Sequence, residues 1–297
     1  MKPSLCLGTA QFGLNYGVTN RNGQVPVVEV GQILGRAEEY GIHFLDTAQA
    51  YGNAESMLGC NLNDDHKFSI ISKFPPQSKK CFDQHDIESW DKSFHESLNR
   101  LKISSLNTFL MHSPADLLKA GSLLLQDWLL GLRAAGFVRR LGVSIYDSKD
   151  LIGINPEILD LVQIPLSLYD QRLINDGTVE RLRSNGTAVH ARSLYLQGLL
   201  LAPSESWPQW IPSEVRNHQQ ALEKIAAKKN CRLVDLALGF AMDQTDLEAI
   251  VIGICDQRQL EDLYLSWSKN SPWVNKEWKN WPLQDCVTID PRLWPDS

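Results

Sequence analysis

An alternation of short apolar runs with amphipathic helical stretches, repeated along the whole chain, most constrains the fold. This alternation is typical of βα units, which build a parallel sheet. Helical patterns separate the apolar runs, and those at 27–41, 121–136 and 178–186 end at Gly, as helices often do; another covers 86–102. Eight runs qualify as strands, at residues 4–10, 43–48, 68–74, 107–113, 139–145, 159–167, 187–194 and 247–253.

Eight units in 297 residues give roughly 37 residues per unit, a natural size for a barrel repeat. No linker or break in composition divides the chain, so we expect one α/β domain over 1–297, a (β/α)8 TIM barrel with eight parallel strands. An open doubly wound sheet is the alternative. It is disfavoured because the first strand-to-helix turn, LGTAQFGLNYG, lacks the G-x-G-x-x-G spacing of a dinucleotide fingerprint.

Two stretches rich in tryptophan and proline do not fit the repeat. One covers 200–232 and the other is a C-terminal tail from about 266. Both are candidates to line a substrate pocket. The plainer interpretation is that their tryptophans hold loops against the barrel by burying large apolar surfaces.

Composition excludes several function classes. The net charge is −6 and no basic cluster is present, so we expect no nucleic-acid partner. No apolar run reaches the roughly 20 residues that span a bilayer, and no basic stretch leads into an apolar signal core, so we expect a cytoplasmic protein without a membrane partner. The six cysteines lack CxxC spacing, which indicates reduced thiols, and we expect no metal site.

Polar residues at the ends of predicted strands are the candidates for chemistry, because a barrel carries its functional groups at the carboxyl ends of its strands. Asp46 ends the second strand, Tyr51 follows it, and Lys73 and His112 end the third and fourth strands. Each alone could be a helix cap, surface packing, an extended lysine or a satisfied core histidine. Together, at consecutive strand ends, they predict a site, because buried charges must be paired.

These side chains suit reduction of a carbonyl group, in which the developing alkoxide must be stabilised and protonated. We expect the phenol of Tyr51 to be the proton donor, and an adjacent ammonium, Lys73, to favour its phenolate form. Asp46 keeps the buried Lys73 charged and in place. We expect His112 to donate to the substrate oxygen and orient it.

The segments FLDTAQAYGNAE, ISKFP and LMHSP resemble the signature segments of the aldo-keto reductase family. The similarity extends from LGTAQFG to IGICDQRQLED. It implies an NAD(P)H-dependent oxidoreductase that reduces an aldehyde, ketone or sugar-like carbonyl, a small-molecule substrate. In this family the matching Asp46, Tyr51, Lys73 and His112 form the catalytic tetrad with Tyr51 as general acid, and Glu55 is a structural partner.

The resemblance also implies a nicotinamide cofactor bound across the barrel mouth, with NADP(H) expected more than NAD(H). Ser144 and Gln163 match residues that hold the carboxamide, whereas Ile145 stands where an asparagine is usual. Arg192 replaces an aromatic residue that stacks on the nicotinamide, a role that a guanidinium plane can also fill. The expected cofactor contacts are Ser144, Gln163, Arg192, Ser193, Gly253 and Arg258.

The segment after the last strand departs most from the family pattern. Gln259 takes the place of the usual arginine for the adenosine 2′-phosphate, and Leu263 that of an asparagine. Asp256 would repel a phosphate, while Arg258 could bind one from a shifted position or be a solvated surface charge.

Two other functions stay open at this point. A regulatory barrel would bind the cofactor with little turnover, and a lyase or epimerase would use Tyr51 and Lys73 as an acid and base. The complete tetrad favours the reductase, because a pure binding module has no need of a lysine-activated phenol.

Overall fold

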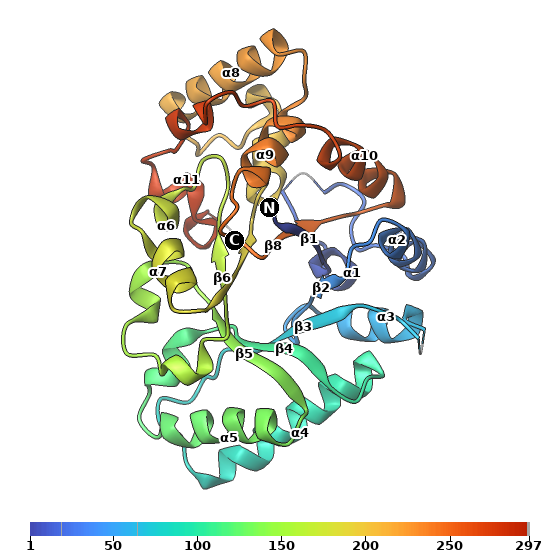
Figure 1. Cartoon of the computed structure of the whole chain (residues 1–297), viewed down its shortest axis with the longest axis vertical. Helices are drawn as coiled ribbons and strands as arrows, with labels where there is room; N and C mark the ends of the chain where they lie inside the picture. Colours follow the sequence, from blue (N-terminus) through green and yellow to red (C-terminus); the bar gives the residue numbers. More distant parts are fainter. Residues whose placement is uncertain (19, 64, 296–297) are drawn as a thin grey trace.

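Eight parallel strands close into a barrel in chain order, with β8 pairing with β1 (Figure 1). The computed structural model describes residues 1–18, 20–63 and 65–295. The predicted (β/α)8 barrel is confirmed, and the open-sheet alternative is wrong. The strands are β1 Ser4–Gly8, β2 Phe44–Asp46, β3 Ser69–Phe74, β4 Leu106–Met111, β5 Val138–Ser144, β6 Leu161–Pro165, β7 Ala188–Arg192 and β8 Ala249–Gly253.

All eight predicted strands are present, and most are shorter than the apolar runs that indicated them. The first run extends to residue 10, but β1 ends at Gly8 because Ala10 already begins a helix. The sixth run extends from 159 to 167, whereas β6 covers Leu161–Pro165. Apolar residues beyond a strand's end are still buried, so the apolar run overestimates the length of the strand.

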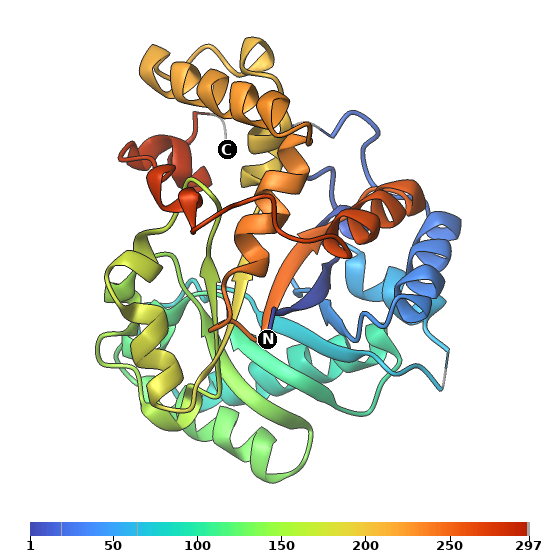
Figure 2. The same cartoon turned by 45° about the horizontal axis from the view of Figure 1, so that its top comes forward.

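Helices surround the strands in both views (Figures 1 and 2). Helix α8 stands outside this ring, at the top of Figure 1. The α-helices are α1 Ala10–Gly13, α2 Val27–Glu39, α3 Ala54–Asn61, α4 Gln84–Leu101, α5 Ser122–Ala134, α6 Arg172–Asn175, α7 Thr178–Ser184, α8 Ser213–Lys228, α9 Leu233–Met242, α10 Gln257–Trp267 and α11 Cys286–Ile289. Short 3-10 helices are η1 Pro114–Leu118, η2 Ser148–Leu151, η3 Pro156–Ile158, η4 Leu196–Leu201, η5 Ser204–Ser206, η6 Glu277–Asn280 and η7 Pro291–Leu293.

Helix α4 shows how the sequence specifies these outer elements. Asp83 accepts a hydrogen bond from the backbone of His85, and Asp86 accepts one from Asp83 in return, so the first turn is capped in both directions. Trp90 and Phe94 recur at helical spacing on the buried face and pack toward the sheet.

The core has two parts. Inside the barrel, a small cluster of buried side chains fills the space between strands. A much larger cluster lies between the strands and the helices. At the amino-terminal end, Glu248 accepts hydrogen bonds from Arg140 and contacts His190 Nε2 at 2.6 Å. Glu248 thus ties β5 and β7 together at this end of the barrel.

The C-terminal tail packs onto the barrel through its tryptophans. Trp273 Nε1 donates to the carbonyl of Leu236 at 2.8 Å, and Trp278 Nε1 donates to Asp243 Oδ2 at 2.8 Å. Helix α11, red in both figures, lies beside α6. These contacts support the packing interpretation of the tail. Within the ranges given above, no helix is long and apolar enough to cross a bilayer.

Candidate active site

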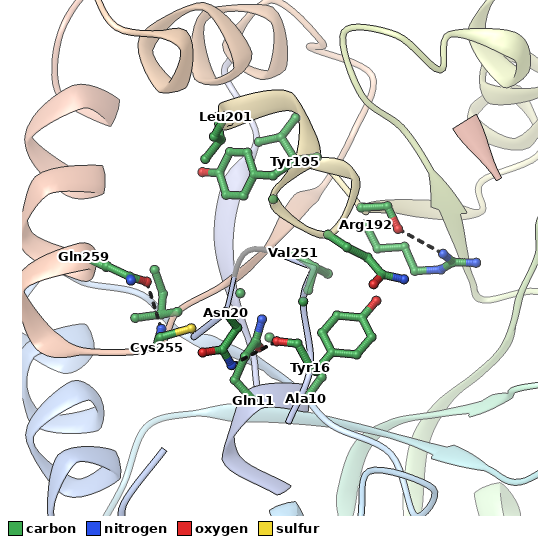
Figure 3. Close-up of a pocket in the computed structure, with 18 of the residues that line it drawn as sticks. Ala10, Gln11, Tyr16, Asn20, Arg192, Tyr195, Leu201, Val251, Cys255 and Gln259 are labelled. Atoms are coloured by element: carbon green, nitrogen blue, oxygen red, sulfur yellow. Dashed lines mark hydrogen bonds between the residues drawn. The ribbon is translucent and has the colours of Figure 1, made fainter. Parts of the chain in front are cut away.

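The carboxyl ends of the strands open into a cavity of about 670 Å³. Its wall includes the ends of β1, β2, β7 and β8 and the loops that follow β1 and β7 (Figure 3). Of the ten site residues predicted from the sequence, six line this cavity: Asp46, Tyr51, His112, Arg192, Ser193 and Gly253. The remaining four, Lys73, Ser144, Gln163 and Arg258, are not part of its wall.

Lys73 lies directly behind the wall and is fully buried. Its Nζ donates to Asp46 Oδ2 at 2.7 Å and to the carbonyl of Thr47 at 2.9 Å, and lies 3.4 Å from the Tyr51 hydroxyl oxygen. Burial lowers the pKa of Lys73, but Asp46 and Tyr51 raise it more, so the pKa stays above its usual value. Lys73 is therefore an ammonium that faces both a carboxylate and a phenol.

The turn that carries Tyr51 is fixed by close backbone contacts. Tyr51 N donates to the carbonyl of Ala48 at 3.0 Å, and the next residue, Gly52, has a φ of 55°. Helix α1 packs against this turn at Gly13, where an ideal Cβ would lie 1.7 Å from the Tyr51 carbonyl oxygen. Only a glycine lets these two segments approach so closely, and their contact sets the position of Tyr51.

His112 faces the same group of side chains. Its ring lies edge-on to that of Tyr51, with 6.1 Å between centroids. Burial, followed by the charges of Lys73 and Arg192, lowers the pKa of His112 to about 4. The imidazole is therefore neutral near pH 7, with one N–H to donate and one nitrogen to accept.

A buried polar network connects this group to the ends of β5 and β6. Gln163 Nε2 donates to Asp46 Oδ1 at 2.6 Å, and Ser144 Oγ lies 3.5 Å from Gln163 Oε1. Both side chains are almost completely buried. The structure thus brings the predicted carboxamide-binding pair into contact with the predicted tetrad.

Glu55 is held below the site by three partners. It accepts hydrogen bonds from Ser72, Ser97 and Arg100, with Arg100 Nη2 at 2.7 Å from Glu55 Oε2. These contacts connect α3 to β3 and α4. They match the structural role expected for Glu55 and keep it away from the cavity wall.

The far end of the cavity lies at the loop after β8 and the first turns of α10. Asp256 caps α10 by accepting from Gln259 N at 2.8 Å, and Gln259 Oε1 accepts from Cys255 N at 3.0 Å (Figure 3). Arg258 is exposed and lies outside the wall. Arg258 is therefore not placed to contact a cofactor phosphate bound in this cavity.

Another arginine, Arg232, does line that end of the cavity. Its Nε lies 3.4 Å from Asp235 Oδ2, and its Nη1 lies 4.0 Å from Asp262 Oδ2. Asp262 also lines the cavity. The charge of this arginine is therefore already balanced by carboxylates.

Gln11 lies against the end of β8 in the cavity wall. A Cβ on Gly253 would lie 2.5 Å from Gln11 Nε2, so the lack of a side chain at Gly253 lets Gln11 pack directly on the backbone of β8. The Oε1 of Gln11 is buried without a hydrogen-bond partner in the part of the chain that the structure describes. This amide oxygen is therefore free to accept a hydrogen bond from a bound ligand.

Sequence reasoning missed several residues of the wall. Gln11 belongs to the short helix α1, Tyr16 and Asn20 come from the loop that follows α1, and Tyr146 and Tyr195 follow β5 and β7. Figure 3 shows the first three across the cavity from Tyr195. The loop was signalled only by its glycines and asparagines, in the segment GLNYGVTN. No tail tryptophan is among the lining residues.

The fold and the site together define a class: parallel (β/α)8 barrels with a cavity at the carboxyl ends of their strands, where a phenol lies beside a buried lysine. The family is equally clear. The sequence model of the aldo/keto reductase family matches residues 4–281. The chain belongs to this family and is an oxidoreductase acting on carbonyl and alcohol groups with a nicotinamide cofactor.

Individual relatives are distant. An NADH-specific methylglyoxal reductase of Escherichia coli (strain K12) is 22% identical in an alignment of length 264 that covers 76% of this chain and 78% of that protein. A glycerol dehydrogenase from Gluconobacter oxydans has a similar structure, with a TM-score of 0.68 and 21% identity over 93% of this chain and 89% of that one. A holo aldo-keto reductase from Bacillus halodurans gives a TM-score of 0.70 at 17% identity, over 99% and 93%. These structures share the fold.

Proposed function

We propose that this protein reduces an aldehyde, ketone or sugar-like carbonyl to an alcohol, with the proton supplied by Tyr51. The observation that carries the proposal is the position of Lys73 Nζ, 2.7 Å from Asp46 Oδ2 and 3.4 Å from the Tyr51 hydroxyl. This arrangement is buried behind a cavity wall that includes Tyr51 and His112. It places a polarised phenol where a small substrate can enter.

Each residue of the group has a separate task. The Lys73 ammonium stabilises negative charge on the Tyr51 oxygen as the phenol gives its proton to the substrate oxygen. Asp46 stabilises the charged form of Lys73, which burial alone would disfavour. The neutral His112 donates a hydrogen bond to the same substrate oxygen and limits its orientation.

The nicotinamide cofactor, when bound, supplies the hydride. We propose that Ser144 and Gln163 hold its carboxamide, because they form the polar network next to Asp46. Gly253, Ser193 and Arg192 line the cavity that would hold the rest of the cofactor. Ser144 and Gln163 are buried next to this cavity and are not part of its wall.

We propose that NAD(H) binds better than NADP(H). The NADP(H) preference expected from the family resemblance stays an untested prediction, and the adenosine end of the groove gives it little support. Asp256 occupies the start of α10, Gln259 is bonded to its own loop, and Arg258 lies outside the wall. The charge of Arg232 is balanced by acidic neighbours. A phosphate there would meet acidic groups, although Arg21 also lines the cavity.

We also propose a cytoplasmic location. All six cysteines lie within the described ranges, and all are free thiols. Such cysteine usage is typical of proteins from reducing compartments.

A steady-state assay tests the proposed reaction. Purified protein is mixed with NADH or NADPH and a panel of aldehydes, ketones and aldoses, and the loss of dihydronicotinamide absorbance is followed. We expect turnover of at least one carbonyl, with a lower KM for NADH than for NADPH. Binding of cofactor without any turnover would instead indicate a regulatory barrel, and product formation without cofactor oxidation would indicate a lyase or epimerase.

A further inference from the structure

Arg192 projects from the end of β7 into the wall of the cavity and is half-buried. Its Nε donates to Ser144 Oγ at 3.3 Å, its Nη1 to Ser193 Oγ at 3.2 Å, and its Nη2 to the carbonyl of Ile145 at 3.0 Å. Its Cζ lies 4.2 Å from the centre of the Tyr146 ring. These neutral partners fix the guanidinium without neutralising it.

Some other arginines of the barrel have carboxylate partners, whereas the half-buried Arg216 donates only to backbone carbonyls. The half-buried Arg172 contacts Asp170 at 2.8 Å. The exposed Arg292 stacks on the same Tyr146 ring at 3.6 Å and is paired with Asp290 at 2.6 Å. In the part of the chain described by the structure, no carboxylate oxygen lies within 4.0 Å of an Arg192 nitrogen. Arg192 thus has an unbalanced charge, which is costly to bury.

The free charge lies at the reactive end of the cavity. Arg192 donates to Ser144, which belongs to the network that reaches Asp46. Its charge also contributes, after burial and Lys73, to the low pKa of His112. An anion bound next to these reacting groups would balance the charge of Arg192.

We propose that Arg192 binds an acidic group of the substrate, so that the carbonyl compounds reduced by this protein carry a carboxylate or a phosphate. This inference rests on the proposed function. A guanidinium has five N–H groups, and Arg192 uses three, so two remain for an oxyanion. Binding there would hold the substrate at one end while its carbonyl meets Tyr51 and His112. Arg192 is then a specificity-determining residue.

Matched pairs of substrates test this proposal. One pair is para-formylbenzoate and its methyl ester, and the other is glycolaldehyde phosphate and glycolaldehyde. With NADH as donor, we expect kcat/KM to be at least about tenfold higher for the acidic member of one pair, since a hydrogen bond to a charged group contributes about 1.5–3 kcal/mol. The pair that shows the preference identifies carboxylate or phosphate as the group that is recognised.

Variants then assign the preference to Arg192. Arg192→Gln should reduce the ratio of acidic to neutral kcat/KM at least about tenfold, mainly through KM, whereas Arg192→Lys should keep part of it because the charge remains. Arg183→Gln is the matched control, since it removes an exposed arginine of α7 that lies outside the cavity. Competitive inhibition by benzoate should weaken in parallel in Arg192→Gln, which gives a measure of binding independent of turnover.

The outcomes separate this inference from the proposed function. If neither pair is turned over with NADH or NADPH, the proposed function fails. If both members of each pair react equally well, or if Arg192→Gln keeps the ratio, the inference is wrong while the function stands. A variant that keeps the ratio but binds NADH more weakly would show that Arg192 serves the cofactor instead.

Discussion

At the residue scale, the charge of Lys73 decides whether Tyr51 can act near neutral pH. A buried lysine without a partner tends to lose its proton, and an unassisted phenol has a pKa of about 10. Asp46 is 97% buried and its two oxygens are both used, one by Lys73 and the other by Gln163. Both oxygens of Asp46 are therefore engaged in hydrogen bonds, and Asp46 acts by holding the ammonium of Lys73 in place.

We propose that Asp256, which caps α10 next to the cavity-lining Cys255, influences the cofactor preference. Asp256→Ser removes its negative charge but keeps a side chain that caps α10, so the helix should still begin at the same place. We expect NADPH to bind roughly fivefold more tightly, equivalent to about 1 kcal/mol of relieved repulsion. Quenching of tryptophan fluorescence during titration with NADPH measures the change.

A matched control for this variant is Asp83→Ser, which replaces the capping aspartate of α4 away from the cavity. It should leave the affinity for both cofactors as it is in the unaltered protein. Equal NADPH affinity in Asp256→Ser and the unaltered protein would show that Asp256 does not face the 2′-phosphate.

The sequence was most informative about residues at strand ends. Asp46, Lys73 and His112 stand out because a polar residue interrupts an apolar run, and the barrel brings those interruptions together. Gln11 and Tyr16 have no such signal, because they come from the short helix α1 and from the loop after it, which folds over the cavity. That loop is held by a contact distant in sequence, from Val18 N to the carbonyl of Gln197. The spacing of apolar residues along the sequence does not reveal such contacts.

At the element scale, the contact between α1 and the turn after β2 sets the reach of Tyr51. Gly13→Ala would place a Cβ 1.7 Å from the Tyr51 carbonyl oxygen and 2.5 Å from Ala54 N, so the turn must shift. A displacement of about 1 Å at a reacting group costs up to about 10²-fold in rate. We therefore expect kcat to fall at least about tenfold, measured with any carbonyl that the unaltered protein reduces.

Gly35→Ala serves as the comparison, because nothing lies within 4 Å of an added Cβ on that exposed side of α2. It should keep kcat and raise the midpoint of thermal unfolding slightly. If Gly13→Ala matches Gly35→Ala in kcat, the position of Tyr51 does not depend on this contact.

The helices were predictable where their apolar residues recur at helical spacing. Helices α2, α4 and α5 follow clear amphipathic patterns, and each lies within or close to its predicted range. Helix α3 had no clear pattern, because its buried face includes Glu55 and Gly59. The buried carboxylate of Glu55 binds Arg100 and interrupts the hydrophobic periodicity of α3. A helix that carries such buried polar residues is therefore difficult to predict from its sequence pattern.

At the scale of the whole molecule, buried titratable groups make stability depend on pH. His112 has its pKa lowered from 6.5 to about 4, so between these values the unfolded chain binds a proton that the folded protein does not. Its contribution to the free energy of unfolding is complete above pH 6.5 and is lost as the pH falls toward 4. Glu248, with a pKa lowered to about 2, adds a loss that begins near pH 4.5.

Urea unfolding at several pH values between 4 and 7 measures this effect. We propose that residues 1–297, including the tail from about 266, unfold as one domain, so a single transition is expected. The free energy of unfolding should decrease between pH 6.5 and 4, and less steeply in His112→Asn. The exposed His85 provides the control, since His85→Asn should keep the slope of the unaltered protein. An unchanged slope in His112→Asn would contradict the account.

The most direct test of the central claim is a single-turnover measurement. Protein saturated with NADH, in excess over an aldehyde that it reduces, is mixed rapidly, and dihydronicotinamide absorbance is followed for the unaltered protein and for Tyr51→Phe. The account predicts loss of absorbance in the unaltered protein and a rate at least about 10²-fold lower in Tyr51→Phe, with NADH still bound. Equal rates in the two proteins would contradict the assignment of Tyr51 as the proton donor.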